Sequence, residues 1–208
     1  ADLEAALVAA DAAAKARLAF LAMVSHELRT PLNAIVGVIG LLGETGLDPA
    51  QRRHVGLMQG SAAALLRIID DILDLARLES GKMAIEAHPF DAAALVAEAA
   101  ETLRGAAEAK ELAFTLDLAA LGTPWMQADA GRIRQVLLNL LGNAVKFTAR
   151  GGVHIAARRL PGPVLELEVA DTGPGLPDED QRRLFEPFVR AGRAGLDRLS
   201  GTGLGLAI

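Results

Sequence analysis

The chain has 208 residues, of which 51% are hydrophobic, and a formal net charge of −5 at pH 7. This length predicts one or two domains with a buried core. The absence of cysteine excludes disulfides and thiolate metal sites, and the acidic balance argues against a nucleic-acid-binding surface. There is no run of about 18 uncharged apolar residues and no secretory signal, so we expect a cytoplasmic fragment without membrane contact. Because a helical pattern is already under way at the first residue, we interpret the chain as a piece of a longer protein.

Residues 2–43 are predicted to form one long amphipathic helix, because apolar side chains recur at steps of three or four. This apolar seam consists of Leu3, Leu7, Ala10, Ala14, Leu18, Leu21, Val24, Leu28, Leu32, Ile35, Ile39 and Leu42. His26 lies roughly 200° around the helix from the seam, so we expect its imidazole to face water. Glu27 follows it directly, Thr30 stands one turn further on the same face, and Pro31 should bend the helix. A lone surface histidine is usually ordinary, but these neighbours make His26 a candidate for chemistry.

A second helix is predicted from about Pro49 to Glu79, with Asp48 as its cap and a short connector before it. Its apolar seam consists of Val55, Met58, Ala62, Leu65, Ile69, Ile72 and Ala76. Two helices on a short connector predict an antiparallel hairpin. One hairpin cannot bury both seams, so we expect a homodimer in which two hairpins form a four-helix bundle.

The period of the pattern changes after Ser80-Gly81, which predicts a boundary between domains at residues 1–80 and 81–208. The predicted strands are 82–87, 112–118, 125–128, 153–160 and 164–170. Helices are expected after the caps Asp91, to about Lys110, and Asp129, to about Phe147. This order predicts an α+β layer with helices on one side of a mostly antiparallel sheet.

Polar residues inside the last of these helices are candidates for a nucleotide site. Asn139 and Asn143 lie one turn apart, although asparagine is a mediocre helix former. Their amide oxygens are of the kind that Mg²⁺ accepts, and the ammonium group of Lys146 can meet a phosphate. On this helix alone, two asparagines on a solvated face are an equally good interpretation.

Three further motifs follow in the second domain. Asp171 to Gly175 (DTGPG) comes directly after a predicted strand, where glycines allow a ligand to approach the backbone. Phe185 to Phe188 (FEPF) places two aromatic anchors in a chain with 3% aromatic residues. Gly201 to Gly205 (GTGLG) would offer backbone N–H groups to a phosphate. Residues 189–200 are glycine- and arginine-rich, with Arg190, Arg193 and Arg198, which is typical of a mobile basic lid.

Two resemblances connect these motifs. Phe20–Ile35 (FLAMVSHELRTPLNAI) closely resembles the phospho-acceptor box of sensor histidine kinases of two-component systems. The later motifs stand in the order N-x-x-x-N-x-x-K, D-x-G-x-G, F-x-P-F and G-x-G-x-G, which resembles the N, G1, F and G2 boxes of the histidine-kinase ATP-binding domain. The implied architecture is a dimerising helical hairpin (1–80) followed by an α/β sandwich that binds ATP (81–208).

The resemblance implies that the γ-phosphoryl group of Mg·ATP passes to His26, on Nε2, and then to an aspartate of a response-regulator receiver domain. Glu27 would orient or deprotonate the imidazole. Thr30 would support dephosphorylation of the regulator; the alternative is that its hydroxyl only bonds to the helix backbone. Asn143 would be the main Mg²⁺ ligand, with Asn139 assisting. The other residues assigned to ATP are Lys146, which would contact phosphate, Asp171, which would contact adenine, and Gly173, Gly175, Gly201, Gly203 and Gly205.

The family pattern continues past the G2 box, whereas this chain stops at Ile208. We therefore expect an incomplete ATP-binding domain, with a sensor domain upstream on the same parent chain. A second interpretation is a non-catalytic, dimeric signalling scaffold whose nucleotide domain is cut short. Measuring whether the chain binds Mg·ATP separates the two.

Overall fold

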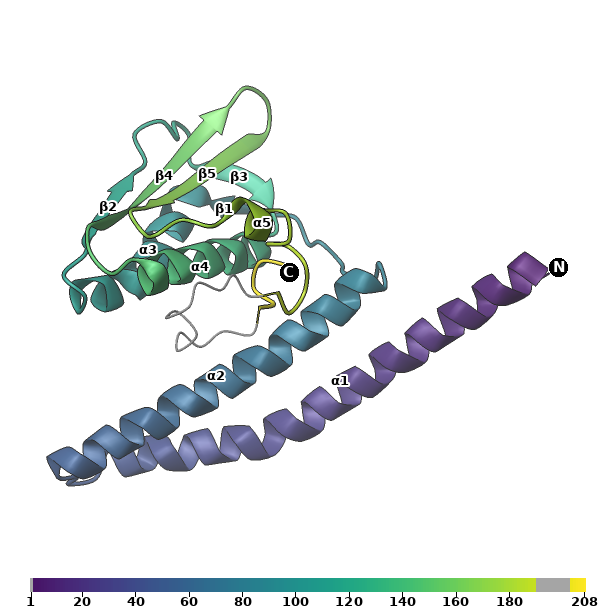
Figure 1. Cartoon of the computed structure of the whole chain (residues 1–208), viewed down its shortest axis with the longest axis horizontal. Coiled ribbons are helices and arrows are strands. Elements are labelled where there is room, and N and C mark those ends of the chain that lie inside the picture. Colours follow the sequence, from purple (N-terminus) through teal and green to yellow (C-terminus); the bar gives the residue numbers. More distant parts are fainter. Residues whose placement is uncertain (1, 190–202) are drawn as a thin grey trace. The chain divides into compact units, whose positions relative to one another are not determined.

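The computed structural model describes residues 2–189 and 203–208. The chain divides into two compact units, residues 1–83 and 84–207, and each is described by itself. The first unit consists of two long helices and the second of strands and shorter helices (Figure 1). Within the described residues, no helix combines the length and the apolar character that crossing a membrane requires.

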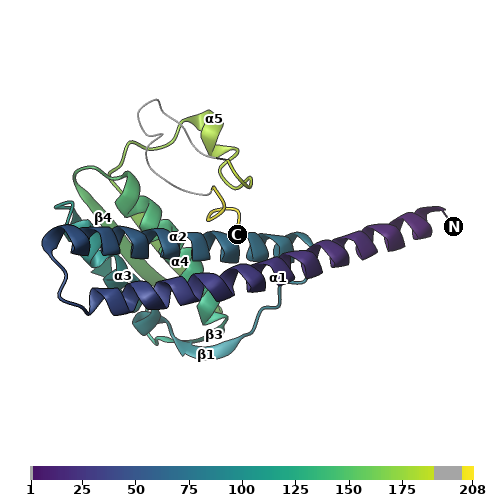
Figure 2. The ribbon, with the colours of Figure 1, turned by 90° about the horizontal axis from the view of Figure 1, so that it is seen from below.

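The first unit is an antiparallel hairpin of α1 (Asp2–Gly43) and α2 (Pro49–Glu79), which run side by side (Figure 2). The predicted cap of α2 is confirmed: the Asp48 carboxylate accepts the Gln51 N–H at 2.8 Å, and the Gln51 side chain accepts the Asp48 N–H at 3.0 Å. This reciprocal pair satisfies two backbone donors at the start of the helix. Pro31 stands inside α1 without ending it, and the axis of α1 bends between its two ends (Figure 1).

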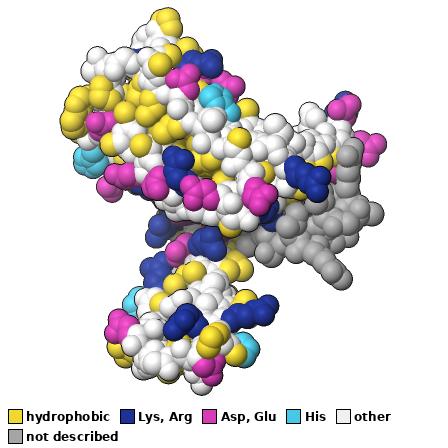
Figure 3. Space-filling view, turned by 90° about the vertical axis from the view of Figure 1, so that its left-hand side faces the viewer, with side chains coloured by type: hydrophobic (Ala, Val, Ile, Leu, Met, Phe, Trp, Pro, Cys, Tyr) yellow, Lys and Arg dark blue, Asp and Glu magenta, His cyan; other side chains and the backbone are white. Residues whose placement is uncertain are grey.

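Burial along the hairpin alternates with a period of seven residues. On α1 the buried seam members are Leu32 and Ile39, and the exposed ones are Leu28, Ile35 and Leu42. On α2 the buried members are Ala62, Ile69 and Ala76, and the exposed ones are Met58, Leu65 and Ile72. Apolar side chains are visible on the surface among the charged ones (Figure 3). A single hairpin therefore covers only half of each seam.

Ion pairs at the surface fix how α1 and α2 are matched along their length. Arg29 reaches Asp70 at 2.5 Å, and Arg17 reaches Glu79 at 3.5 Å. All four side chains are largely solvated, so each pair contributes no more than about 1 kcal/mol. The buried apolar residues between the helices are the main source of stability in this unit.

The second unit contains five strands and three helices among its described residues. They are β1 (His88–Asp91), α3 (Ala92–Glu108), β2 (Ala113–Asp117), β3 (Trp125–Ala128), α4 (Ala130–Phe147), β4 (Gly152–Leu160), β5 (Val164–Asp171) and α5 (Asp178–Gln181). β1 pairs antiparallel with β3, while β4 lies between β2, which is parallel to it, and β5, which is antiparallel. The predicted sheet is thus present as two separate sheets.

The strand predicted at residues 82–87 is wrong. The strand begins only at His88, where β3 supplies a partner for four residues. Glu86, just before it, donates its N–H to the Asp129 carboxylate at 3.3 Å instead of to a strand. An alternating pattern without a neighbouring strand is not sufficient for a β-strand.

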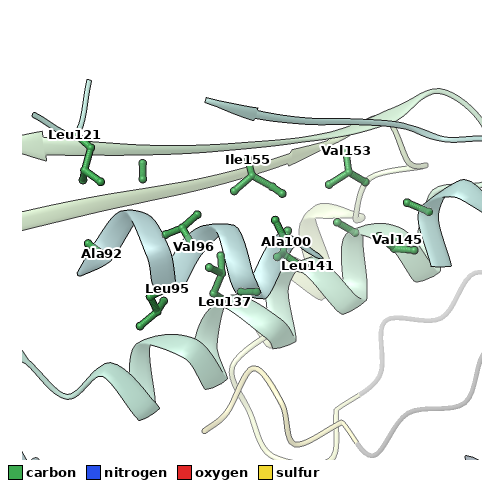
Figure 4. Packing of buried hydrophobic residues seen from close by; sticks show 14 of the residues in the cluster. Ala92, Leu95, Val96, Ala100, Leu121, Leu137, Leu141, Val145, Val153 and Ile155 are labelled. Atoms are coloured by element: carbon green, nitrogen blue, oxygen red, sulfur yellow. The ribbon is translucent and has the colours of Figure 1, made fainter. Parts of the chain in front are cut away.

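The core of the second unit lies between the strands and the helices α3 and α4 (Figure 4). Val96 of α3, Leu137 and Leu141 of α4, and Val153 and Ile155 of β4 are almost completely buried there. The spacing matches each element, since Leu137 and Leu141 are four residues apart on the helix and Val153 and Ile155 are two residues apart on the strand. This packing holds α4 against the sheet and leaves its other face for the site.

Candidate functional site

His26 lies on the solvent-facing side of α1, as predicted. Its side chain is 79% exposed, and that of Glu27 is 77% exposed. The imidazole Nδ1 is 3.6 Å from a Glu27 carboxylate oxygen, a separation that a small rotation closes to a hydrogen bond. Ser25, the residue before His26, is only 3% exposed and stands seven residues before the buried Leu32. The helix thus presents the imidazole outward with a carboxylate beside it.

Thr30 uses its hydroxyl within the helix. The Oγ1 atom donates to the His26 carbonyl oxygen at 3.1 Å, directly before Pro31. This is the backbone contact of the alternative interpretation. The hydroxyl still lies on the exposed side of α1, one turn from the imidazole, so its role towards a regulator stays a prediction.

The asparagine-bearing helix α4 meets the second glycine motif. The Asn139 carboxamide donates its Nδ2–H to the Gly205 carbonyl oxygen at 2.9 Å, across 66 residues of sequence. A Cβ atom at Gly205 would lie 3.3 Å from that carboxamide, so a side chain there would press on Asn139. Within the described part of the chain, the half-buried Asn143 carboxamide has no hydrogen-bond partner. Its oxygen is available to a ligand.

Asp171 ends β5 and begins the first glycine motif. Its Oδ1 atom accepts the Gly173 N–H at 2.7 Å. A Cβ atom at Gly173 would lie only 2.6 Å from the same oxygen, so a side chain there would displace the carboxylate. Gly175 has a φ of +66°, a left-handed conformation that favours glycine. The hydroxyl of Thr172, the residue after Asp171, accepts the Gly152 N–H at 3.0 Å and so ties this turn to β4.

The remaining predicted residues are only partly described. Gly203 has a φ of +72°, and its carbonyl oxygen accepts the Phe188 N–H at 2.9 Å, which joins the phenylalanine motif to the second glycine motif. The Lys146 ammonium group lies 4.7 Å from the centre of the Phe147 ring. The residues that fall outside the described part of the chain are Gly201 and the predicted lid arginines Arg190, Arg193 and Arg198.

Two residues around the site were not predicted. Thr148 is fully buried after α4, and its hydroxyl lies 3.5 Å from the Asp171 carboxylate. Lys110, just after α3, donates to three carbonyl groups at the end of α4. Neither has a local sequence signal, because both contacts join segments more than 20 residues apart.

Asp129 shapes the electrostatics at the start of α4. Its carboxylate accepts the Arg132 N–H at 3.0 Å and the Glu86 N–H at 3.3 Å. These backbone hydrogen bonds hold the pKa of Asp129 below its usual value of 3.8. The ionised carboxylate therefore caps the helix that carries the asparagines.

The fold and these contacts define a hairpin that presents a histidine beside a carboxylate to solvent, joined to an α/β domain with glycine motifs around an asparagine-bearing helix. Residues 16–81 match the His Kinase A (phospho-acceptor) domain family. Residues 128–208 match the family described as histidine kinase-, DNA gyrase B- and HSP90-like ATPase. The chain belongs to the sensor histidine kinases, as the sequence motifs predicted.

Individual relatives agree with this assignment. The signal transduction histidine-protein kinase BarA of Escherichia coli K12 is 40% identical over 211 residues, which cover 100% of this chain and 23% of BarA. The autoinducer 2 sensor kinase/phosphatase LuxQ of Vibrio cholerae is 39% identical over 202 residues, 96% of this chain and 24% of LuxQ. A crystal structure of full-length ShkA in complex with AMPPNP is 40% identical, with a TM-score of 0.70 over 90% of this chain and 38% of ShkA. The chain spans about a quarter of the length of BarA and of LuxQ.

Proposed function

We propose that this chain is the kinase part of an ATP-dependent protein-histidine kinase that phosphorylates His26. The observation that carries the proposal is the 79% exposed imidazole with a carboxylate 3.6 Å from Nδ1, in a chain that also assembles the asparagine and glycine motifs. The likeness of residues 128–208 to an ATPase family supports ATP as the phosphoryl donor, and the related ShkA structure contains AMPPNP.

The position of Glu27 favours attack by Nε2. A neutral imidazole carries one proton and one lone pair, and the nitrogen that faces a carboxylate keeps the proton. Because Nδ1 is the nitrogen near Glu27, the lone pair of Nε2 is free to form the bond to the γ-phosphorus. The bond from this phosphorus to the bridging oxygen breaks, ADP leaves, and the Nδ1 proton is shared with Glu27.

The residues present fit a magnesium–nucleotide complex. Asn143 has an unoccupied carboxamide, and Asn139 uses its Nδ2–H on Gly205, which leaves its oxygen for a cation. Mg²⁺ takes a few protein oxygens together with substrate phosphates, and it would neutralise phosphate charge here. Lys146 would contact phosphate, and the Asp171 carboxylate would accept a hydrogen bond from the amino group of adenine.

We also propose that the chain acts as a homodimer. The exposed row of Leu28, Ile35 and Leu42 on α1 and the matching row on α2 would each cover the other in a second hairpin. Their seven-residue spacing is that of helices packed in a bundle. This arrangement would bury the half of each seam that one hairpin leaves in water.

The phosphoryl group would then pass from His26 to an aspartate of a response-regulator receiver domain. This step would leave the imidazole free for another cycle. LuxQ is named a sensor kinase/phosphatase, which supports a second, dephosphorylating role of the same hairpin through Thr30. Because the relatives are about four times longer, a sensor domain elsewhere in the parent chain is part of this proposal.

The alternative is a dimeric scaffold that binds no nucleotide. Incubation of the chain with Mg²⁺ and γ-labelled ATP distinguishes the two, and we expect label that is lost in acid and survives base, as a phosphoramidate does. His26→Gln should abolish labelling, whereas His54→Gln, a matched exposed histidine on α2, should not. Asn143→Asp should also abolish it without changing the oligomeric state. Acid-stable label, or label that persists in His26→Gln, would contradict the proposal.

A further inference from the structure

We propose that Thr148 positions the Asp171 carboxylate and thereby determines the selectivity of this chain for adenine over 6-oxopurine nucleotides. The inference rests on the proposed function, since it assumes that Asp171 reads the base of a bound nucleotide. Thr148 would be a positioning residue, acting through Asp171 without touching the nucleotide.

The backbone of Thr148 is held on both sides. Its N–H donates to the Ala144 carbonyl oxygen at 3.0 Å, which closes the last turn of α4. Its carbonyl oxygen accepts the Lys110 ammonium group at 3.3 Å. The same ammonium group donates to Val145 at 2.7 Å and to Lys146 at 2.9 Å, so one cation binds three carbonyls of this turn. These hydrogen bonds fix the position of the Thr148 backbone, and with it the direction in which the side chain leaves the backbone.

The hydroxyl of Thr148 is directed at Asp171. The residue is 0% exposed, and a buried hydroxyl requires a hydrogen-bond partner. Among the described residues, its partner is Oδ1 of Asp171, at 3.5 Å, which is longer than the roughly 2.5–3.0 Å usual for an O–H···O hydrogen bond. The Gly173 N–H donates to the same oxygen at 2.7 Å. Oδ1 thus has two protein donors, whereas Oδ2 accepts no hydrogen bond within the described part of the chain.

Close packing reinforces this orientation. A Cβ atom at Gly173 would meet Oδ1 of Asp171 at 2.6 Å and Oγ1 of Thr148 at 3.5 Å, which shows how little space separates the three residues. The carboxylate cannot turn without giving up both donors. Oδ2 is consequently the oxygen left to meet a ligand.

A carboxylate oxygen fixed in this way distinguishes purines by the group at position 6. Adenine carries an amino group there, which can donate to Oδ2. Hypoxanthine carries an oxo group there. The oxo oxygen and Oδ2 are both hydrogen-bond acceptors, so they would face each other without a proton to share. Removing the Thr148 hydroxyl would leave the Gly173 N–H as the one donor to Oδ1 among the described residues. The carboxylate would be held less firmly and would lose part of its ability to distinguish the two bases.

The test measures the dissociation constants of Mg·ATP and Mg·ITP for the whole chain by isothermal titration calorimetry. We expect the wild type to bind ATP at least about tenfold more tightly than ITP. Thr148→Val, which keeps the shape and removes the hydroxyl, should lower this ratio by roughly fivefold to tenfold, mainly through weaker ATP binding. Thr148→Ser should restore it. Thr102→Val, which removes a hydroxyl bonded to Glu98 on the surface of α3, should leave it unchanged.

Two outcomes would overturn the inference while leaving the proposed function standing. One is a wild type that binds ATP and discriminates, with an unchanged ratio in Thr148→Val. The other is a Thr148→Val variant that binds both nucleotides equally more weakly, because that would indicate a purely structural residue. Should the valine variant not fold, Thr148→Ala provides the same comparison. A wild type that binds neither nucleotide would contradict the proposed function itself, and the inference with it.

Discussion

At the scale of single residues, the face of α1 around His26 combines an imidazole, a carboxylate and a hydroxyl within two turns. The Glu27 carboxylate lies on the Nδ1 side of the imidazole, and the Thr30 hydroxyl bonds to the His26 carbonyl oxygen. The contact with Glu27 bears on the proposed transfer of the imidazole proton. The bond from Thr30 holds the backbone before Pro31, and the proposed role of Thr30 towards a docked regulator is separate from it.

Thr30→Ala separates these two uses. We expect autophosphorylation near the wild-type rate, because the hydroxyl bonds to the His26 carbonyl oxygen of the helix backbone. Loss of phosphate from the regulator should slow by at least about tenfold, since the hydroxyl would no longer orient the attacking water. Both rates must be measured on one preparation, with Thr30→Ser as the control that keeps the hydroxyl. If the two rates fall together, the hydroxyl serves only the helix.

The carboxyl group of Asp129 makes the stability of the folded chain depend on pH. Its pKa is lowered in the folded chain by the N–H groups of Arg132 and Glu86, so its charge stabilises the folded state above about pH 4. That contribution is lost as the pH falls through the lowered pKa. Asp129→Asn keeps a capping side chain and removes the charge. Its melting temperature should lie below that of the wild type at pH 7, and the difference should narrow in acid. A constant difference from pH 7 to pH 3 would contradict this explanation.

At the scale of elements, the end of α4 is bound by a cation from the turn that follows α3. Lys110 donates to three carbonyl groups there, which would otherwise lack partners at the helix end. In Lys110→Met, amide hydrogen exchange in the last turn of α4 should accelerate by roughly tenfold, equivalent to about 1.4 kcal/mol. Lys82→Met is the matched control, because the Lys82 ammonium group makes no such contact with any residue that the structure describes. Equal exchange in both variants would show that the cap contributes nothing.

The hairpin requires a partner for its exposed apolar rows. Ile35→Arg places a charge in the middle of the α1 row, where a second hairpin would bury it, so we expect the dimer to dissociate. Asn33→Arg adds the same charge two residues away and outside the row. Sedimentation velocity at micromolar concentration should give a monomer for the first variant and a dimer for the wild type and the second. A monomeric wild type would contradict the four-helix bundle.

At the scale of the whole molecule, the sequence was most informative where the structure depends on neighbours in the chain. The caps Asp48, Asp91 and Asp129 were all predicted, and each carboxylate accepts a backbone N–H at the start of its helix. The seams of both long helices were predicted as well. What their spacing could not show is which seam members face the other helix of the same hairpin.

Contacts between distant segments could not be predicted from the sequence. The parallel pairing of β2 with β4 joins residues about 40 positions apart, and no turn motif in the sequence indicates it. The contacts of Thr148 with Asp171 and of Lys110 with Val145 join residues 23 and 35 positions apart in the sequence. The motif order did indicate that Asn139 and Gly205 belong to one site, although it could not indicate the hydrogen bond between them.

Locating the phosphoryl group on the chain tests the proposed function most directly. Trypsin cleavage after arginine and lysine places the four histidines on four separate peptides, with His26 in 18–29, His54 in 54–67, His88 in 83–104 and His154 in 151–158. The chain is incubated with Mg·ATP and digested at alkaline pH, and the peptides are analysed by tandem mass spectrometry. We expect the added phosphoryl mass on peptide 18–29 alone, with fragment ions that assign it to His26. Phosphorylation of another peptide with 18–29 unmodified, or of no peptide under conditions in which the chain binds Mg·ATP, would contradict the assignment of His26 as the phospho-acceptor.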